Sequence, residues 1–326
     1  MNIALLDDYL SVVATLPSVA EFLARDDHHV TIWKDHTTDV ATLAERLRDI
    51  DALVLLRERT PVTSALIARL PRLRVITLNG PYPHVDVKAC TEHGVLLCAG
   101  AAQPSYATAE LTWGLVISAM RRIPQEMARL KAGQWQGTVG TGLRGRRLGV
   151  LGYGTIGKQV AGFGRAFGMN VMVWSREKGL AAARADGHEA AQSQDALFEN
   201  ADVVTLHVRL KPETRGIVTA GHLARMKPHS VLVNTSRAAL IEPGALVSAL
   251  RAGRPGAAAV DVYEHEPVID GHPLLELDNV VCTPHLGYVE RDQLDRYYRA
   301  QLARVCAFDR GEPTDAVNPE ALTPRH

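Results

Sequence analysis

The sequence predicts an α/β protein that folds as two doubly wound parallel-sheet domains. Three observations predict it: the length, two successive series of alternating strand and helix patterns, and a glycine-rich turn in the second series. At 326 residues the chain is long enough for about two domains. Apolar residues make up 46% and charged residues 22%, which excludes a disordered chain, a collagen-like rod and a coiled coil.

The first hundred residues alternate short β-rich runs with segments of helical spacing. The predicted strands are Ile3–Leu6, Val30–Trp33, Ala52–Leu56, Val75–Leu78 and Val95–Leu97. The predicted helices are Val40–Arg48, Ser64–Leu70 and Asp86–His93. Strands that alternate with helices form parallel sheets with helices on both faces, so this region predicts the first domain.

A second series begins near Ser105, which is predicted to cap a long helix that runs to Arg122. A polar, glycine-rich connector, Gly133–Gly145, follows this helix. The predicted strands are Leu148–Leu151, Val171–Trp174, Val203–His207, Val231–Asn234, Ala257–Asp261 and Val280–Thr283. The predicted helices between them are a segment that ends at Phe167, Ala220–Met226 and Gly244–Arg251. The last helical segment, Glu290–Arg310, lies beyond this series, and we expect it to return to the first domain.

Charge and cysteine usage restrict the partners and the environment. Lys plus Arg and Asp plus Glu both number 36, so the net charge is zero and indicates neither nucleic acid nor a membrane surface as partner. The four cysteines have no zinc-ligand spacing, so no metal site is predicted. The N-terminus lacks the basic start and long apolar stretch of a signal peptide. We therefore expect a cytoplasmic protein in a reducing compartment.

A glycine-rich turn lies between a predicted strand and a predicted helix. It contains Gly152, Gly154 and Gly157, with Thr155 and Ile156 before the last glycine. The first glycine permits the tight turn, the second lets the backbone approach a pyrophosphate, and the third lets the helix pack on the strand. Unpaired N–H groups at the start of the helix favour the phosphates. The pattern therefore predicts a dinucleotide site.

The same turn also matches most of the phosphate-binding loop of nucleoside triphosphatases. That motif requires Ser or Thr after the lysine, to hold Mg²⁺, and this chain has Gln159 after Lys158. A triphosphatase is therefore the weaker interpretation of these residues.

The end of the next strand distinguishes NAD from NADP. An acid there binds the ribose 2′-hydroxyl of NAD, whereas an arginine accommodates the 2′-phosphate of NADP. The chain has Ser175 and Arg176, a hydroxyl donor and a guanidinium that suit a phosphate. Glu177 follows them and could instead turn toward a ribose. The sequence favours NADP and leaves NAD open.

Three further segments follow in order: N-T-S-R at 234–237, D-V-Y-E-H-E-P at 261–267 and T-P-H-L-G at 283–287. Together with the glycine-rich turn, they resemble the D-isomer-specific 2-hydroxyacid dehydrogenases, which include phosphoglycerate dehydrogenases and hydroxypyruvate and glyoxylate reductases. The resemblance implies a Rossmann nucleotide domain at 104–288 and a flavodoxin-like substrate domain formed by 1–103 plus 289–326. The active site would lie in the cleft between the two domains, at the carboxyl ends of the strands.

The resemblance also implies that Arg237, Glu266 and His285 form the catalytic set. These residue types suit the reduction of a 2-oxo acid. An arginine pairs with the planar carboxylate through its forked guanidinium, and a histidine delivers a proton to the carbonyl oxygen as hydride arrives. The carboxylate of Glu266 would orient the imidazole and favour its protonated form.

By the same resemblance, further residues contact the cofactor or the substrate. The cofactor candidates are Thr108, Thr235, Ser236 and Asp261, and the substrate candidates are Arg57, Asn79, Gly80, Arg237 and His285. The loop that usually offers N–H groups to the substrate carboxylate reads L-N-G-P-Y-P-H-V-D here, at 78–86. Because Pro81 and Pro83 have no N–H group, we expect this departure to alter the substrate more than the reaction.

The sequence therefore predicts an oxidoreductase that transfers a hydride between NAD(P)H and a small 2-oxo acid or D-2-hydroxy acid. We expect a homodimer joined through the helix at 105–120 and its neighbours. One alternative is a dinucleotide-sensing binding protein of the corepressor type with little turnover, and the other is the triphosphatase.

Overall fold

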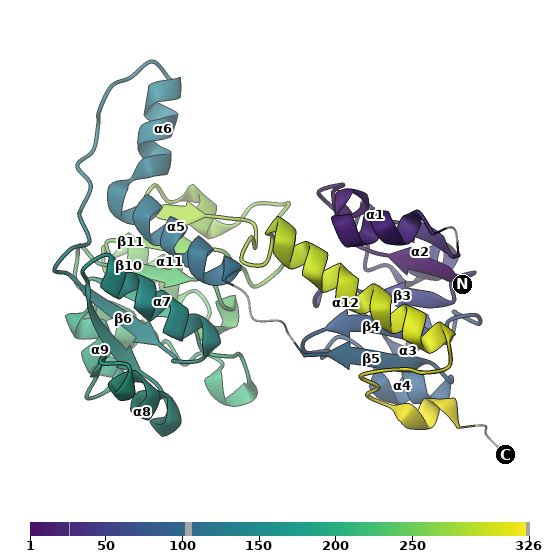
Figure 1. Ribbon diagram of the computed structural model, residues 1–326. Helices are drawn as coiled ribbons and strands as arrows, with labels where there is room; N and C mark the ends of the chain where they lie inside the picture. The colour runs from purple at the N-terminus through teal and green to yellow at the C-terminus, as the bar shows by residue number, and fades with distance from the viewer. Residues whose placement is uncertain (26, 102–105, 324–326) are drawn as a thin grey trace. The chain divides into compact units, whose positions relative to one another are not determined.

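The computed structural model describes residues 1–25, 27–101 and 106–323. The chain divides into two compact units (Figure 1). Unit 1 consists of Met1–Pro104 and Arg291–His326, and unit 2 consists of Ser105–Glu290. No helix in the described ranges is long and apolar enough to cross a membrane.

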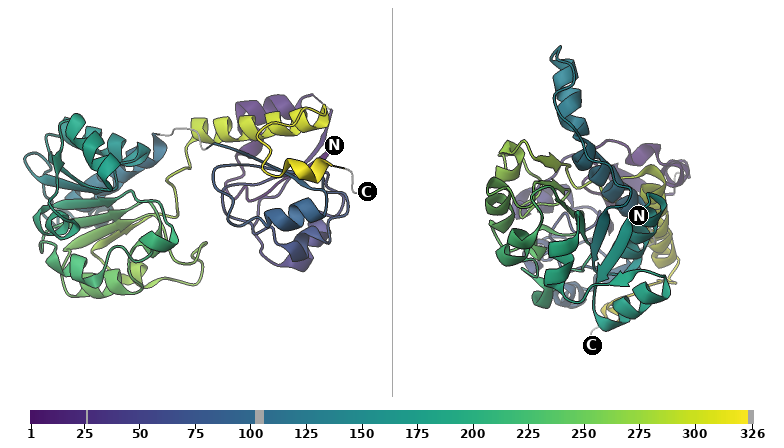
Figure 2. Two further views of the ribbon diagram at one scale, coloured as in Figure 1. Left: turned by 90° about the horizontal axis from the view of Figure 1, so that it is seen from below. Right: turned by 90° about the vertical axis from the view of Figure 1, so that its left-hand side faces the viewer.

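Unit 1 contains a five-stranded sheet of order β2-β1-β3-β4-β5, and its strand pairings are parallel. The strands are β1 Asn2–Leu5, β2 His29–Ile32, β3 Ala52–Val54, β4 Val75–Asn79 and β5 Leu96–Gly100. The helices are α1 Pro17–Leu23, α2 Val40–Arg46, α3 Ser64–Ile67, α4 Val87–Glu92 and α12 Arg291–Asp309. The strand order reverses between β1 and β3, as in flavodoxin-like domains. Helix α12 packs against α1 and β4 (Figure 2).

Unit 2 contains a seven-stranded parallel sheet of order β12-β11-β10-β9-β6-β7-β8. The strands are β6 Arg147–Leu151, β7 Asn170–Trp174, β8 Glu189–Ala190, β9 Val203–Leu206, β10 Val231–Asn234, β11 Ala257–Val260 and β12 Val280–Cys282. The helices are α5 Ala107–Arg121, α6 Ile123–Lys131, α7 Thr155–Ala166, α8 Glu177–Ala185, α9 Gln194–Asn200, α10 Ala220–Arg225 and α11 Ala245–Arg251. The order reverses between β6 and β9, which is the arrangement of a Rossmann domain. The predicted fold class is confirmed.

Both faces of the seven-stranded sheet are buried. Along β10, Val231 and Val233 join a cluster with α5 and α7 residues, while Leu232 joins the cluster on the opposite face. Successive side chains of a strand point to opposite faces, so a sheet covered on both sides requires continuous apolar strands. This explains why the strands of unit 2 are apolar runs in the sequence.

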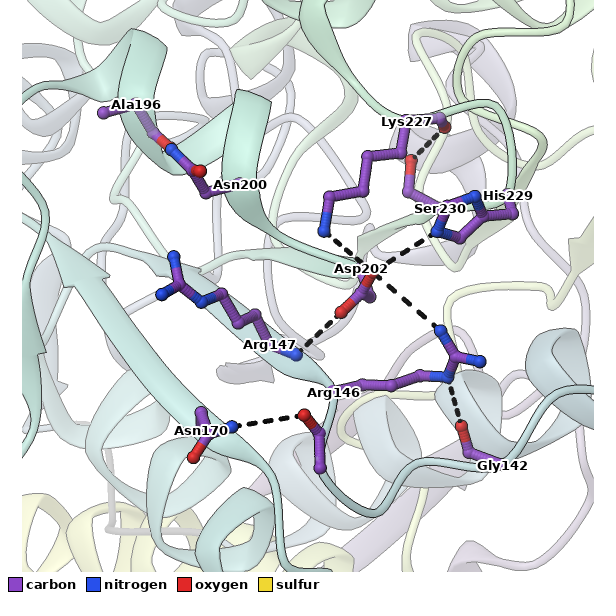
Figure 3. A network of polar contacts seen from close by, with 11 residues as sticks. Gly142, Arg146, Arg147, Asn170, Ala196, Asn200, Asp202, Lys227, His229 and Ser230 are labelled. Carbon is purple, nitrogen blue, oxygen red and sulfur yellow. Dashed lines mark hydrogen bonds and ion pairs between the residues drawn. The ribbon is translucent and has the colours of Figure 1, made fainter.

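The amino edge of the same sheet is held by one carboxylate (Figure 3). Asp202, immediately before β9, accepts a hydrogen bond from the Arg147 backbone N–H at 2.8 Å. Its other oxygen lies 2.9 Å from Lys227 Nζ, 3.4 Å from His229 Nε2 and 4.0 Å from Arg146 Nη1. Asp202 therefore ties together the amino ends of β6, β9 and β10.

Some predicted boundaries differ from the structure. Ser105, the predicted cap of the long helix, lies outside the described residues, and α5 begins at Ala107. This helix ends at Arg121 because Arg122 is left-handed, with φ 54°, and α6 follows at once. Strand β5 extends to Gly100 because Cys98 and its successors pair with β4. Helices α1, α6, α8 and α9 and strand β8 were not predicted.

Candidate functional site

The glycine-rich turn between β6 and α7 has room for a ligand where its middle glycine lies. Gly152 has a left-handed φ of 93°, and a Cβ there would meet the His207 carbonyl at 2.7 Å. A Cβ on Gly157 would overlap the Gly152 carbonyl oxygen. A Cβ on Gly154, which precedes α7, would meet no atom within 4 Å. Two glycines thus allow close backbone contact, and the third leaves open space at a helix N-terminus, as a pyrophosphate requires.

His207, which follows β9, flanks this turn and was not singled out from the sequence. Its Nε2 is buried, with no hydrogen-bond partner among the described residues. Burial lowers the pKa of His207 to about 3, so the ring is neutral beside the turn. The signal available in the sequence was its place at the end of a predicted strand next to the glycines.

The end of β7 places Ser175 and Arg176 beside the turn. Ser175 Oγ accepts a hydrogen bond from the Tyr153 backbone N–H at 3.3 Å. Arg176 is exposed immediately before α8. The carboxylate of Glu177 pairs with Arg184 Nη1 at 3.3 Å, so this acid is engaged on its own helix.

A buried carboxylate holds the loop that carries His285. Asp261, at the end of β11, accepts hydrogen bonds from Thr283 Oγ1 at 2.6 Å, Leu286 N at 2.7 Å and Gly287 N at 2.8 Å. Burial raises the pKa of Asp261 above its usual value. Within this loop His285 has a left-handed φ of 55°, which costs free energy in a residue other than glycine and is found disproportionately at functional sites.

His285 forms a close pair with Glu266. Its Nδ1 lies 2.5 Å from Glu266 Oε2, and both side chains are mostly buried. The other oxygen, Glu266 Oε1, accepts the Tyr263 backbone N–H at 3.0 Å, and the Tyr263 hydroxyl donates to the Thr283 carbonyl at 3.1 Å. Because Glu266 holds Nδ1, Nε2 is the nitrogen through which the ring can exchange a proton.

The loop after β10 carries Arg237 and is held by a side chain that was not predicted. Asn234 Nδ2 donates to the Arg237 carbonyl at 2.9 Å, and its Oδ1 accepts the Ser236 N–H at 3.0 Å. Ser236 Oγ donates to the Val208 carbonyl at 2.8 Å. Asn234 belongs to the N-T-S-R segment, and asparagine commonly holds such turns through its amide, which was the signal available.

The glycine turn follows β6, Arg237 follows β10, Glu266 follows β11 and His285 follows β12, so all of them lie at the carboxyl edge of one parallel sheet. The model of the D-isomer specific 2-hydroxyacid dehydrogenase NAD binding domain matches residues 113–287. The chain belongs to the D-isomer specific 2-hydroxyacid dehydrogenase family. The resemblance predicted from the sequence is confirmed, and membership of this family sets the triphosphatase interpretation aside.

Relatives of this chain include curated proteins and solved structures. The D-3-phosphoglycerate dehydrogenase of Methanocaldococcus jannaschii is 42% identical over 80% of this chain and 52% of its own length, so this chain spans about half of that relative. The glyoxylate reductase of Aeropyrum pernix is 34% identical over 95% of both chains. The solved phosphoglycerate oxidoreductase of Vibrio cholerae is 44% identical, with a TM-score of 0.90 over 95% of this chain and 99% of that one.

Threonines on α5 connect two loops of unit 2. Thr108 Oγ1 donates to the Gly287 carbonyl at 2.6 Å, and Thr112 Oγ1 donates to the Thr108 carbonyl at 2.7 Å. The Thr112 and Thr235 hydroxyls lie 2.8 Å apart. Because a hydroxyl has one proton, Thr235 is the donor to Thr112. This series of hydrogen bonds thus joins the Arg237 loop to the His285 loop. Thr112 was not predicted as part of the site.

In unit 1, the predicted substrate residues make internal hydrogen bonds. Arg57 has a left-handed φ of 58°, and its N–H donates to the Tyr297 hydroxyl at 3.0 Å. Asn79 uses its amide on Tyr297 and Arg304. The Gly80 N–H donates to the Gly100 carbonyl at 2.9 Å. Binding of substrate by Arg57, Asn79 and Gly80 stays a prediction.

In the part of the chain that the structure describes, no group of three or more His, Cys, Asp or Glu side chains could hold a metal ion.

Proposed function

We propose that the protein catalyses reversible hydride transfer between NAD(P)H and a small 2-oxo acid, which forms a D-2-hydroxy acid. The observation that carries the proposal is the His285–Glu266 pair, with Nδ1 and Oε2 2.5 Å apart. A proton donor held by a carboxylate is what the carbonyl oxygen needs when it accepts a hydride on its carbon. The family supports the same reaction class.

The glycine-rich turn would hold the dinucleotide. In this proposal Gly152, Gly154 and Gly157 allow the pyrophosphate to approach, and Thr155 and Ile156 add N–H groups from the first turn of α7. Thr108, Thr235, Ser236 and Asp261 would lie toward the nicotinamide. The cofactor supplies the hydride, and the chain supplies binding, orientation and the proton.

The catalytic set would act on the substrate as follows. Arg237 binds the carboxylate and polarises the carbonyl through its guanidinium. His285 donates a proton from Nε2 to the carbonyl oxygen, while Glu266 orients the ring and stabilises its positive charge. In the oxidative direction His285 takes the proton from the hydroxyl of the 2-hydroxy acid.

Steady-state reduction of a panel of 2-oxo acids tests this function. The panel includes glyoxylate and 4-methyl-2-oxopentanoate, since relatives named for these substrates match the chain. Rapid oxidation of the reduced cofactor with at least one acid is expected. Cofactor binding without turnover of any acid would favour the dinucleotide-sensing alternative.

A preference for NADP over NAD is proposed from the end of β7. Ser175 and Arg176 provide a hydroxyl and a guanidinium for a 2′-phosphate. Glu177, the acid that could favour NAD, pairs with Arg184 instead. Replacing Arg176 with Ala should raise the Kd of NADPH by at least tenfold more than that of NADH, and equal losses for both cofactors would contradict the preference.

A homodimer is proposed through α6. The predicted contact, the helix at 105–120, buries its apolar face in unit 2 as α5. In contrast, Ile123, Met127 and Leu130 are exposed at helical spacing on α6, and Trp135 and Val139 after it are 74% and 93% exposed. Figures 1 and 2 show α6 extending away from the rest of unit 2. Exposed apolar side chains that gather on one segment indicate an interface, and a monomeric mass by light scattering would contradict it.

The remaining assignments follow from the same function. Unit 1 would be the substrate domain, with Arg57 near an anionic group of the acid. A cytoplasmic location is supported by the four cysteines, which are free thiols, as expected in a reducing compartment.

A further inference from the structure

Helix α12 carries a stripe of buried polar side chains. Tyr297, Gln301 and Arg304 are 6%, 0% and 7% exposed, and their spacing places them on one face of the helix. That face packs against β3 and β4 of unit 1. Burying polar groups is costly unless they are hydrogen-bonded, so the bonds of these side chains indicate what the face does.

The Tyr297 hydroxyl contacts the two segments that carry the candidate substrate residues. It accepts the Arg57 N–H at 3.0 Å and the Asn79 N–H at 3.4 Å, and it donates to the Asn79 carbonyl at 3.3 Å. A tyrosine hydroxyl has one proton and accepts through its lone pairs, so a single oxygen joins the segment after β3 to the end of β4.

Gln301 and Arg304 continue the same attachment. The Gln301 amide nitrogen, turned toward the strands, donates to the Thr77 carbonyl at 2.7 Å and the Leu55 carbonyl at 3.2 Å. Arg304 Nη1 donates to Asn79 Oδ1 at 2.7 Å. A Cβ on Gly100 would overlap the Arg304 guanidinium, so the last residue of β5 must be small for this arginine to reach β4.

Arg57 needs such support because its backbone is left-handed, with φ 58°, a conformation that side chains disfavour. The surrounding contacts must hold a strained residue in place. Arg57 follows β3, one of the two strands between which the sheet order reverses. In open α/β sheets ligands bind at this point, beyond the carboxyl ends of the strands.

We propose that Tyr297 is a positioning residue for substrate binding: its hydroxyl holds Arg57 and the end of β4 in the arrangement that presents Arg57 to an anionic group of the acid. The proposal rests on the function proposed above. Tyr297 acts through Arg57, so its removal affects the binding of the 2-oxo acid and not the binding of the dinucleotide.

The test compares Tyr297→Phe with Tyr298→Phe, which removes a neighbouring buried hydroxyl from the same helix. Tyr297→Phe should raise the KM for the preferred 2-oxo acid about tenfold, as expected for the loss of a buried hydrogen bond. Its kcat and its Kd for the dinucleotide should stay within about twofold of the wild type. Tyr298→Phe should leave all three constants within about twofold. An unchanged KM in Tyr297→Phe would overturn the proposal.

A double-mutant cycle with Arg57→Ala tests whether Tyr297 acts through Arg57. If it does, adding Tyr297→Phe to Arg57→Ala should raise KM by less than about twofold, whereas independent effects would multiply. Multiplying effects would overturn the proposal.

Amide hydrogen exchange provides a readout that does not depend on turnover. Exchange at the Arg57 amide should be faster in Tyr297→Phe than in the wild type and unchanged in Tyr298→Phe. If no 2-oxo acid is reduced, the proposed function fails, yet this measurement still tests the attachment. Equal exchange rates in all three proteins would overturn it.

Discussion

The two edges of the seven-stranded sheet each hold a buried carboxylate, and the partners of these carboxylates differ. Asp202, at the amino edge, accepts a backbone N–H and also faces the cationic side chains of Lys227 and Arg146. Asp261, at the carboxyl edge, accepts its bonds from a threonine hydroxyl and two backbone N–H groups, which are all neutral.

This difference shifts the pKa values of the two carboxyl groups in opposite directions from the ordinary value. Burial alone would raise the pKa of Asp202, but the Arg147 N–H and the Lys227 ammonium outweigh it and hold the pKa below 3.8. At Asp261 burial dominates its neutral donors and raises the pKa above 3.8. The carboxylate at the amino edge is paired with cationic side chains, whereas the carboxylate at the carboxyl edge is hydrogen-bonded by neutral donors, so burial disfavours its charged form.

The largest contrast between the edges is expected when a histidine is removed from each. His285→Ala should lower kcat by about 10²–10⁴-fold, the usual contribution of a general acid. Dinucleotide affinity should persist, because the phosphates would be held at Gly152–Gly157. The matched control, His229→Ala at the amino edge, should leave kcat unchanged. Kinetics and cofactor titration measure both variants, and near-normal reduction by His285→Ala would end the proposed mechanism.

Asp261→Asn tests whether the carboxyl edge depends on its anion. The substitution replaces one carboxylate oxygen of Asp261 with an amide NH₂ group, which donates and cannot accept. This group would face the N–H of Leu286 or Gly287, so the His285 loop would lose one hydrogen bond. A displaced catalytic group costs about 10²-fold in rate, and kcat should fall by that order while the melting temperature changes little. An unchanged kcat would show that the loop does not need this carboxylate.

Asp202→Asn should have the opposite profile. Losing a charge-assisted hydrogen bond costs about 2 kcal/mol of unfolding free energy at pH 7, whereas kcat should stay within about twofold of the wild type. Urea denaturation measures the first quantity and steady-state kinetics the second. A stable but inactive variant would contradict the separation of the two edges.

The pH dependence of these stability differences should also be opposite. The folded pKa of Asp202 lies below 3.8, so its contribution is present above that pH and is lost as pH falls through the folded pKa. The folded pKa of Asp261 lies above 3.8, so its contribution is present below 3.8 and is lost as pH rises through the folded pKa. The difference in unfolding free energy between the wild type and each Asn variant can be measured from pH 3 to pH 7. This difference should increase with pH for Asp202→Asn and decrease with pH for Asp261→Asn.

The smallest expected effect is that of Arg146→Ala. Its Nη1 lies 4.0 Å from Asp202, and its side chain is 36% exposed. Exposed ion pairs contribute about 0–1 kcal/mol, so the unfolding free energy should fall by less than about 0.5 kcal/mol. A loss as large as that of Asp202→Asn would show that the arginine, and not Lys227, is the main partner of the carboxylate.

Features with local signals could be predicted from the sequence. The alternation of apolar strands with helices predicted two parallel sheets, because sheets covered on both faces require such runs. The glycine spacing predicted the turn after β6, whose geometry depends on missing Cβ atoms at Gly152 and Gly157. Helix α6 was not predicted because it begins after Arg122, whose left-handed φ ends α5. An arginine in a sequence does not indicate such a backbone conformation.

Features that depend on distant partners could not be predicted. Asn79 is predicted as a substrate residue because it lies in the loop that resembles the family's carboxylate-binding loop, but its amide bonds reach Tyr297 and Arg304, which lie in α12. Asp202 similarly gains its role from Lys227 and Arg147. Such pairings form because the order of the strands in the sheet brings distant residues together. A single sequence has no local pattern that shows this order.

The order of segments along the chain has a consequence for synthesis. All of unit 2 lies between β5 and α12, so a ribosome completes the seven-stranded domain before it makes the helix that covers β4. Domains fold as units while the chain emerges, and contacts between distant segments form late. We therefore expect unit 2 to fold before unit 1. Until α12 is synthesised, the N-terminal strands of unit 1 would remain in a collapsed, aggregation-prone state, which chaperones would recognise.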